Sequence, residues 1–295
     1  MGPRPADLGV DATVKQGMTE TPRRASRSAA LVAACRMLAA ELPEPERLID
    51  DPYAHLVVDD VALAAARADE PLQNVIRLRT RYVDDAIRAF VACQIPPRPQ
   101  VLLLGAGFDA RAFRMDVDAD FFEVDFPATL ALKAEALSGV EPKVRRVAVP
   151  VDLAAAGFVD PLIGAGFDQE RSTIVVCEGV INYLDAATAE SVVEQVARLL
   201  SPGGQLVADY VEMAWFKGGD FERPTGAISK RLRDGGEPLR DGLPDIHGTL
   251  DRHGFDVIDD EALELLPPRY GLEPRERHYP ARMVTTVRRS RATPA

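Results

Sequence analysis

From residue 100 onward, short apolar segments alternate with longer segments that carry the apolar periodicity of helices. The first segment, 101–104, is wholly apolar, as expected for a central parallel strand that is buried on both faces. Further strand-like segments lie at 120–124, 144–149, 173–177, 205–210, 255–259 and 283–288. Helical periodicity appears between them at 127–137, 186–200 and 246–253. The alternation predicts an α/β fold, a doubly wound Rossmann-like sheet of seven strands with helices on both faces.

The residues before this alternation predict a set of helices. Residues 1–20 are polar and contain Pro and Gly, so we expect a disordered N-terminal tail. In 26–42 the apolar side chains recur at helical spacing, and Pro43 ends that segment. We therefore expect a helical cap at 21–70, followed by one α/β domain at 71–295.

A long polar connection interrupts this domain at about 212–245. Connections of this length are uncommon in compact domains, where they often form lids over a site. The connection contains Trp215, Phe216 and Phe221. We expect a lid insertion whose aromatic side chains select a bulky or aromatic ligand.

The helix expected at 71–93 carries an arginine close to its apolar stripe. At about 100° per residue, Ile76, Val83, Ile87 and Phe90 share one stripe, and Arg79 lies within about 60° of its centre. The opposite face carries charged side chains, and Arg81 among them is expected to be solvated: Arg77, Arg81, Asp84, Asp85 and Arg88. A guanidinium directed at a core must meet an anion or bear a large desolvation cost. Arg79 is thus expected either to snorkel or pair with an internal acid, or to bind an anionic ligand group.

A glycine-rich turn follows the first strand directly. Gly105, Ala106 and Gly107 begin the sequence GAGFDA, which satisfies the G-x-G-x-x-G/A pattern of dinucleotide-binding turns. Glycines let the backbone approach a ligand closely, and a helix N-terminus favours negative charge. Alone the pattern is weak, since such turns also serve simple packing.

Three acids end three successive strands. Asp125 lies 20 residues after Gly105, where nucleoside-binding α/β folds place a carboxylate that accepts hydrogen bonds from ribose hydroxyls. Glu123 is the second choice for that role, and a helix N-cap is the alternative for Asp125. Asp152, with Leu153 beside it, and Glu178 end the next two strands. Because ligands of open α/β sheets bind at the carboxyl ends of the strands, these acids are expected to converge on one crevice.

Several motifs resemble those of class I S-adenosylmethionine (SAM)-dependent methyltransferases, and more narrowly the leucine carboxyl methyltransferase family, which includes bacterial polyketide O-methyltransferases. The motifs are DPY at 51–53, RTRYVDD at 79–85, LGAGFDAR at 104–111, FEVDFP at 122–127, EGVINYL at 178–184 and LLSPGGQL at 199–206. The resemblance extends over about residues 25–290.

The resemblance implies SAM as the cofactor and assigns it contacts. Arg79 aligns with an arginine that binds the methionine carboxylate, and Glu178 is placed near the methionine amino group. The glycine turn, with Gly105, Ala106 and Gly107, is placed along the methionine portion. Asp125 is placed at the ribose, Asp152 and Leu153 near adenine, and Arg27 matches a basic residue that contacts SAM, although its spacing to the DPY motif is longer.

The expected reaction is transfer of a methyl group to an oxygen of a small-molecule or peptide acceptor. A carboxylic acid is ionised at about pH 7 and requires no general base, whereas a phenol, with a pKa of about 10, benefits from one. A carboxylate in secondary metabolism is the first choice, and a polyketide phenol is the alternative. Tyr183 is a candidate for orienting the acceptor and His247 for a base, although each is also explained as an ordinary core or surface residue.

Two other functions remain open on sequence grounds. The glycine turn alone permits an NAD(P)-dependent oxidoreductase, whereas Asp152, Glu178 and the Pro-Gly-Gly turn favour SAM. A third reading is a SAM-binding domain that has lost catalysis. That domain would bind the cofactor and form no methylated product.

Composition narrows the partners. The net charge of −11 disfavours broad contact with nucleic-acid phosphates, which requires an excess of Lys and Arg. The three cysteines, Cys35, Cys93 and Cys177, are odd in number and show no metal spacing, so we expect no metal site and a reducing, cytoplasmic location. No apolar run reaches the roughly 20 residues of a membrane helix. The sequence does not indicate an oligomeric state.

Overall fold

The structure of the 295-residue chain is a computed structural model, and it describes residues 27–155, 157–211, 233, 237–274 and 281–290. The predicted tail at 1–20 lies outside the described residues. So does most of the predicted lid insertion, including its three aromatic side chains.

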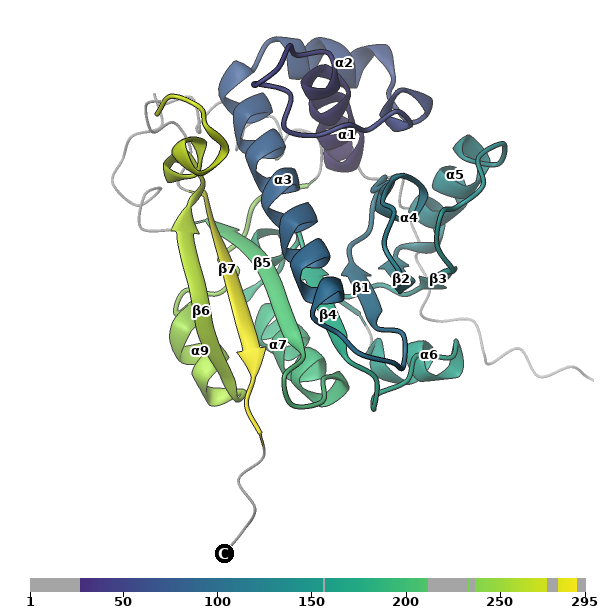
Figure 1. The fold of residues 1–295 in the computed structure, drawn as a ribbon, viewed down its shortest axis with the longest axis vertical. Helices are drawn as coiled ribbons and strands as arrows, with labels where there is room; N and C mark the ends of the chain where they lie inside the picture. The colour runs from purple at the N-terminus through teal and green to yellow at the C-terminus, as the bar shows by residue number, and fades with distance from the viewer. Residues whose placement is uncertain (1–26, 156, 212–232, 234–236, 275–280, 291–295) are drawn as a thin grey trace, which may run out of the picture.

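One seven-stranded sheet organises the fold, in the order β3-β2-β1-β4-β5-β7-β6 (Figure 1). The strands are β1 (Gln100–Leu104), β2 (Asp120–Asp125), β3 (Arg146–Pro150), β4 (Thr173–Cys177), β5 (Gln205–Val211), β6 (Phe255–Ala262) and β7 (Ala281–Arg288). The first five are parallel, and β7 pairs antiparallel with both β5 and β6. The prediction of a doubly wound, seven-stranded α/β sheet is confirmed.

Alternate side chains of each central strand enter two separate cores. Leu102 and Leu104 of β1 pack with helices α6 (Val159–Gly164), α7 (Ala186–Leu199) and α9 (Ile246–Arg252). Val101 and Leu103 pack on the other face, with α3 (Glu70–Ala92) and α4 (Arg111–Arg114). A short helix, α5 (Pro127–Ala136), joins β2 to β3. Because both faces are covered, β1 and β4 are apolar after their first residue, as the sequence indicates.

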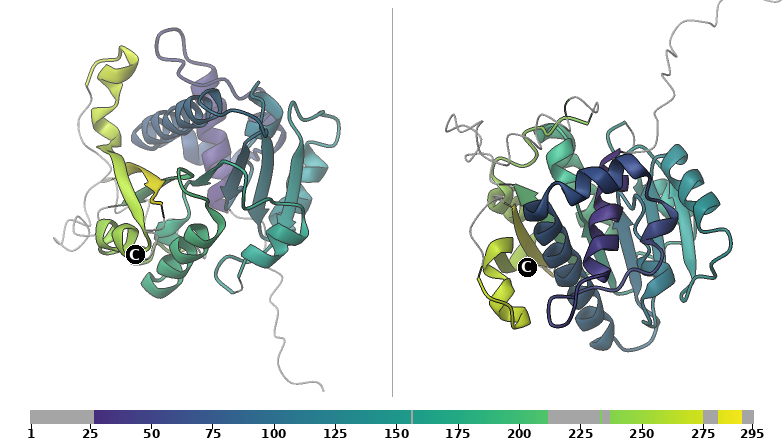
Figure 2. Two further views of the ribbon diagram at one scale, coloured as in Figure 1. Left: turned by 60° about the horizontal axis from the view of Figure 1, so that its bottom comes forward. Right: turned by 90° about the horizontal axis from the view of Figure 1, so that it is seen from above.

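The N-terminal helices lie over the carboxyl ends of the parallel strands, as the view from above shows (Figure 2). They are α1 (Arg27–Ala40), the short η1 (Ala54–Leu56) and α2 (Asp60–Arg67). A small core of their own, which includes Leu31, Cys35 and Ala66, joins α1 and α2 to Ile76 of α3. The cap is therefore attached to the sheet mainly through α3.

The face of α3 opposite its apolar stripe is only partly exposed to solvent. Arg77 and Asp84 are each only 2% exposed. Arg77 donates to the backbone oxygen of Glu46 at 2.9 Å, and Asp84 pairs with two arginines of α4. A helical wheel cannot show charged partners that arrive from other elements. Arg81, by contrast, is 36% exposed at its side chain and pairs with Asp85 one turn away.

Short connections and helix starts follow local rules. Asp69 precedes α3 and accepts a hydrogen bond from the Leu72 N–H at 3.0 Å, while a proline occupies the first turn. Asp185 caps α7 in the same way, since its side chain accepts a hydrogen bond from the Thr188 N–H at 2.9 Å.

Among the described residues, no helix combines the length and the apolar composition that a membrane span requires.

Candidate functional site

The candidate site lies at the carboxyl ends of the neighbouring strands β1 and β4, where the strand order of the sheet reverses. In the sheet order, β1 neighbours β2 on one side and β4 on the other, so the connections leave in opposite directions at this point. Open α/β sheets bind ligands in the crevice formed at such a reversal. Gly105 follows β1, Asp125 ends β2 and Glu178 follows β4, so three predicted residues meet there.

The glycine turn is closely packed. Gly105 has φ +64°, and a Cβ on it would lie 2.3 Å from Cγ2 of Val180. Gly107 has φ +45°. Ala106 is buried, and its N–H donates to the Val124 oxygen at 3.0 Å. A side chain at Gly105 is excluded by both backbone conformation and space, which brings the backbone close to whatever occupies the crevice.

Asp125 ends β2 facing this turn. Its carboxylate accepts hydrogen bonds from the N–H groups of Gly107 and Phe126, each at 2.6 Å, and the residue is 8% exposed. Burial raises the pKa of Asp125 above its ordinary value, against the lowering effect of the two backbone hydrogen bonds. Asp125 therefore holds the glycine turn in place and keeps further acceptor capacity for a ligand.

Glu123 has a different role from Asp125. It is fully buried, and its Oε2 accepts from Lys133 Nζ at 2.8 Å and from Arg146 at 2.7 Å. The carboxylate thus forms a buried ion pair behind the strand end. The second-choice assignment of Glu123 to the ribose is not supported by this arrangement.

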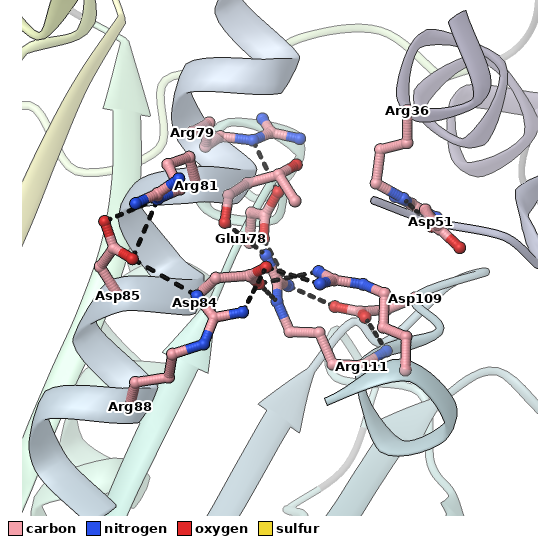
Figure 3. A network of polar contacts seen from close by, with 12 residues as sticks. Arg36, Asp51, Arg79, Arg81, Asp84, Asp85, Arg88, Asp109, Arg111 and Glu178 are labelled. Atoms are coloured by element: carbon pink, nitrogen blue, oxygen red, sulfur yellow. Dashed lines mark hydrogen bonds and ion pairs between the residues drawn. The ribbon is translucent and has the colours of Figure 1, made fainter. Parts of the chain in front are cut away.

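Arg79 belongs to a buried ionic cluster on the α3 side of the sheet (Figure 3). Its Nε is 2.9 Å from Glu178 Oε1, and its Nη1 is 2.8 Å from Asp209 Oδ2. Although burial acts to lower the pKa of Arg79, Asp209 and Glu178 hold it above its ordinary value. The expectation that Arg79 pairs with an internal acid is met by two acids at once, and one nitrogen, Nη2, remains.

Glu178 connects Arg79 to a second arginine. Its Oε2 is 2.7 Å from Nη1 of Arg111, whose Nε is 2.7 Å from Asp84. Arg111 also contacts Asp109. Burial acts to raise the pKa of Glu178, but Arg111 and Arg79 outweigh it and keep the pKa below its ordinary value. Glu178 is therefore an anion that faces two cations (Figure 3).

Asp209 and Arg111 belong to the site but are not among the residues predicted from the sequence. Asp209 lies near the carboxyl end of β5, so the strand-end rule that selected the other acids would also have selected it. Arg111 stands in the LGAGFDAR motif, where it was noted only as part of a resemblance. Nothing in the local pattern marks it as the partner of Asp84 and Glu178.

Asp152 and Leu153 follow β3 at the edge of this region. Asp152 is partly buried and its Oδ1 accepts from the Ala154 N–H at 2.9 Å. Leu153 packs against the core on the α7 side. Their contact with adenine stays a prediction.

Arg27 begins α1, and its backbone N–H donates to Glu237 at 2.8 Å. The Ser28 N–H donates to the other oxygen of Glu237, also at 2.8 Å. The Arg27 side chain is exposed, so the structure shows no contact for it with the Arg79 cluster, and its cofactor contact stays a prediction.

Tyr183 and His247 lie in different places. Tyr183 is in η2 (Ile181–Tyr183), after Glu178, and its side chain hydrogen-bonds to Ser28. His247 of α9 hydrogen-bonds through Nε2 to Asp260. The preceding strand residue, Asp259, contacts Tyr82 of α3, and because successive strand side chains point to opposite faces, His247 lies on the face away from α3. A base role for His247 stays a prediction.

A family comparison decides the identity of this arrangement. The model of the leucine carboxyl methyltransferase family matches residues 29–197, more than half of the chain. The matched span includes Arg79, the glycine turn, Asp125 and Glu178, and it ends before Asp209. The chain belongs to the leucine carboxyl methyltransferase family. It is accordingly a SAM-dependent methyltransferase, and the nicotinamide alternative is not supported.

Curated relatives agree with this family. A protein of Mycobacteroides abscessus named "Putative S-adenosyl-L-methionine-dependent methyltransferase" is 33% identical over 231 residues, covering 71% of each chain. A similarly named protein of Mycolicibacterium vanbaalenii is 29% identical, covering 78% of this chain and 76% of its own. Both names state the cofactor and neither states an acceptor.

Solved structures support the fold. A DUF574-family protein from Streptomyces avermitilis matches with a TM-score of 0.58 at 15% identity, covering 87% of this chain and 96% of its own. A protein from Thermobifida fusca, described as a methyltransferase, matches with a TM-score of 0.57 at 15% identity and covers 89% and 94%.

The residues present fit SAM. The glycine turn leaves no room for a side chain beside Val180, and Asp125 keeps acceptor capacity for hydroxyl groups. Nη2 of Arg79 donates to none of the described residues. Glu178 is held as an anion, as an ammonium or sulfonium neighbour requires. Among the residues that the structure describes, no group of His, Cys, Asp or Glu is arranged to hold a metal ion.

Proposed function

We propose that the chain methylates a carboxylate oxygen of a small-molecule or peptide acceptor and releases a methyl ester. When bound, SAM supplies a methyl group on a positively charged sulfur. Displacement from sulfur needs an acceptor lone pair aligned with the breaking bond and a site from which water is excluded. The finer assignment, carboxylate over phenol, depends on which protein groups stand near the acceptor.

The observation that carries the proposal is the state of Tyr183. Burial raises the pKa of Tyr183 to about 12, against the lowering effect of its hydrogen bond to Ser28. The phenol therefore stays protonated near neutral pH, where it is able to donate a hydrogen bond to an acceptor and does not remove a proton from it. Such a donor suits an acceptor that is already ionised.

None of the three described histidines contacts this cluster. His55 is exposed in η1, His247 contacts Asp260 on the other face, and His253 lies 3.4 Å from Glu190 of α7. A phenol with a pKa of about 10 would need a proton acceptor at the site, whereas a carboxylate with a pKa near 4 would not. The described residues thus favour an acceptor that arrives as an anion.

The cap supplies the remaining positioning. Ser28 and Ala29 begin α1 beside the glycine turn, since a Cβ on Gly107 would lie 3.2 Å from the Ala29 Cβ. Tyr183 lies close to the same helix start through Ser28. In this proposal the start of α1 and Tyr183 together orient the acceptor and keep water from it.

The test pairs acceptors that differ only in the reacting group. Aromatic and polyketide-like acids, and their phenol counterparts, are incubated with SAM, and products are identified by mass spectrometry before and after mild alkali, which cleaves esters and leaves ethers. We expect esters, with kcat/KM nearly independent of pH between about 6 and 9. Ether products with a rate that rises with pH would favour the phenol alternative. SAM binding without a methylated product from any acceptor would favour the alternative of a SAM-binding domain that has lost catalysis.

A further inference from the structure

Asp209 holds two parts of the site at once. Its Oδ2 accepts from Nη1 of Arg79 at 2.8 Å, and its Oδ1 accepts from the N–H of Gly179. The residue is 7% exposed, near the carboxyl end of β5. Because Glu178 accepts from Nε of the same arginine at 2.9 Å, two guanidinium nitrogens are fixed by protein carboxylates.

The third nitrogen of Arg79 is left for a ligand. Nη2 makes no hydrogen bond to any residue that the structure describes. It lies beside Gly179, where a Cβ would be 3.3 Å away and where φ is +69°. Asp209 therefore sets both the rotation of the guanidinium and the backbone next to its free edge.

Asp209 also decides the charge of the buried network. The network joins three guanidinium groups and four carboxylates whose side chains are at most 16% exposed, which gives a net charge of −1: Arg79, Arg111, Arg114, Asp84, Asp109, Glu178 and Asp209. Arg88 approaches Asp84 only at 3.9 Å from a half-exposed position, where solvent screens it. Without the Asp209 carboxylate the buried network would be neutral.

The cofactor and its product differ by one charge. SAM carries a carboxylate, an ammonium and a sulfonium, a net charge of +1. In the transfer the carbon–sulfur bond breaks and its electron pair stays on sulfur, so the thioether product, S-adenosylhomocysteine (SAH), is neutral overall. A buried site of net charge −1 favours the cation over the neutral product.

We propose that Asp209 is a positioning residue that fixes Arg79 for the methionine carboxylate and makes the site prefer SAM to SAH. At an effective dielectric constant of about 20, removing one nearby negative charge lowers the affinity for a cation by roughly tenfold. In Asp209→Asn we expect SAM to bind about tenfold more weakly and SAH at most about threefold more weakly. The ratio of the two dissociation constants is the readout, because loss of mere structure weakens both ligands alike.

The experiment is calorimetric titration of SAM and of SAH into the full chain, with circular dichroism to verify folding. Asp209→Glu keeps the charge, so it is expected to keep the wild-type ratio even if both affinities fall. Asp251→Asn is the charge-matched control, since Asp251 is 73% exposed on α9 and pairs with Arg289. If Asp209→Asn does not fold, Asp209→Ser provides the neutral variant with an acceptor for Gly179. An unchanged ratio in the neutral variant, with affinities either equally reduced or unaltered, would overturn the proposal.

Discussion

Arg36 of α1 donates a hydrogen bond through Nη2 to the backbone oxygen of Phe108, at 2.7 Å. Phe108 follows the glycine turn directly, so the cap helix is bonded to the segment that is predicted to bind the cofactor. The Nε of the same arginine is 2.8 Å from Asp51, the first residue of the DPY motif. Arg36 and Asp51 are both buried. The motif therefore holds Arg36 in place, and Arg36 in turn is bonded to the segment after the glycine turn.

Replacing Arg36 with Met should both destabilise the chain and weaken cofactor binding. The change leaves the Asp51 carboxylate buried without its partner, which costs about 3–5 kcal/mol of unfolding free energy. It also removes the bond to Phe108, so SAM affinity should fall by more than about threefold. Urea denaturation measures the first effect and calorimetric titration at a temperature where the variant is folded measures the second.

Arg47→Met is the control for this variant. Arg47 pairs with Glu44 at 3.0 Å, but both side chains are largely exposed. Exposed pairs contribute at most about 1 kcal/mol. A cost for Arg36→Met no larger than that of the control would show that the buried pair does not anchor the cap.

Gly105→Ala should abolish measurable cofactor binding. The added Cβ would lie 2.3 Å from Val180, and the backbone has φ +64°. Gly203→Ala separates the two causes, because Gly203 has φ +85° with no atom within 4 Å of its Cβ position. We expect the control to cost about 1 kcal/mol of stability and to bind SAM normally. Equal binding by both variants would remove the glycine turn from the site.

Much of this architecture can be predicted from the sequence because it depends on the pattern of apolar and charged residues within single segments. The strand segments are short apolar runs, and the acids at the ends of β2 and β4 occupy positions that the fold class makes functional. Arg79 was singled out because a charge near an apolar stripe needs an anion. Its anions, Glu178 and Asp209, come from positions 99 and 130 residues away.

The remainder depends on packing between distant elements. The helical wheel places Asp84 opposite the apolar stripe, and nothing within α3 shows that Arg111 and Arg114 cover it. The place of His247 on the far face was equally hidden, since it follows from which way Asp260 of β6 points. The periodicity of side chains describes a single helix or strand. It therefore cannot predict contacts that join two elements, such as those of Asp84 with Arg111 and of His247 with Asp260.

Glu237→Gln should loosen the start of α1. The Glu237 carboxylate accepts from the backbone N–H groups of Arg27 and Ser28, at 2.8 Å each, as an N-terminal cap does. Loss of the charge should cost roughly 0.5–2 kcal/mol locally. Hydrogen exchange of the amides at 27–31 should quicken by at least about threefold, while amides of α7 should not change. Unchanged exchange at 27–31 would mean that Glu237 does not hold the helix.

Asp125→Asn should weaken SAM binding by at least about tenfold, because a charge-assisted hydrogen bond contributes roughly 1.5–3 kcal/mol. The amide retains one oxygen for the backbone N–H of Gly107, so the turn is less disturbed than by Ala. Burial raises the pKa of Asp125, so wild-type affinity should begin to fall, as pH decreases, above the ordinary aspartate range. The variant should lack that fall. Calorimetric titration across pH tests both points, and normal affinity in a folded variant would refute the ribose assignment.

Asp84→Asn should lower stability in a way that depends on pH. Although burial acts to raise it, Arg114 and Arg111 hold the pKa of Asp84 well below its ordinary value. Since the unfolded chain takes up the proton at higher pH than the folded chain, Asp84 stabilises the fold above about pH 4 and loses that contribution as pH falls.

At about pH 7 the Asp84→Asn variant, with two arginines left facing an uncharged amide, should be less stable than wild type by about 3–5 kcal/mol. By about pH 3 the difference from wild type should narrow by about 1 kcal/mol, because each pKa unit corresponds to about 1.4 kcal/mol. Urea denaturation at several pH values measures this, with the half-exposed Asp256 changed to Asn as the control. A difference that is constant across pH would show that Asp84 is not held ionised by the two arginines.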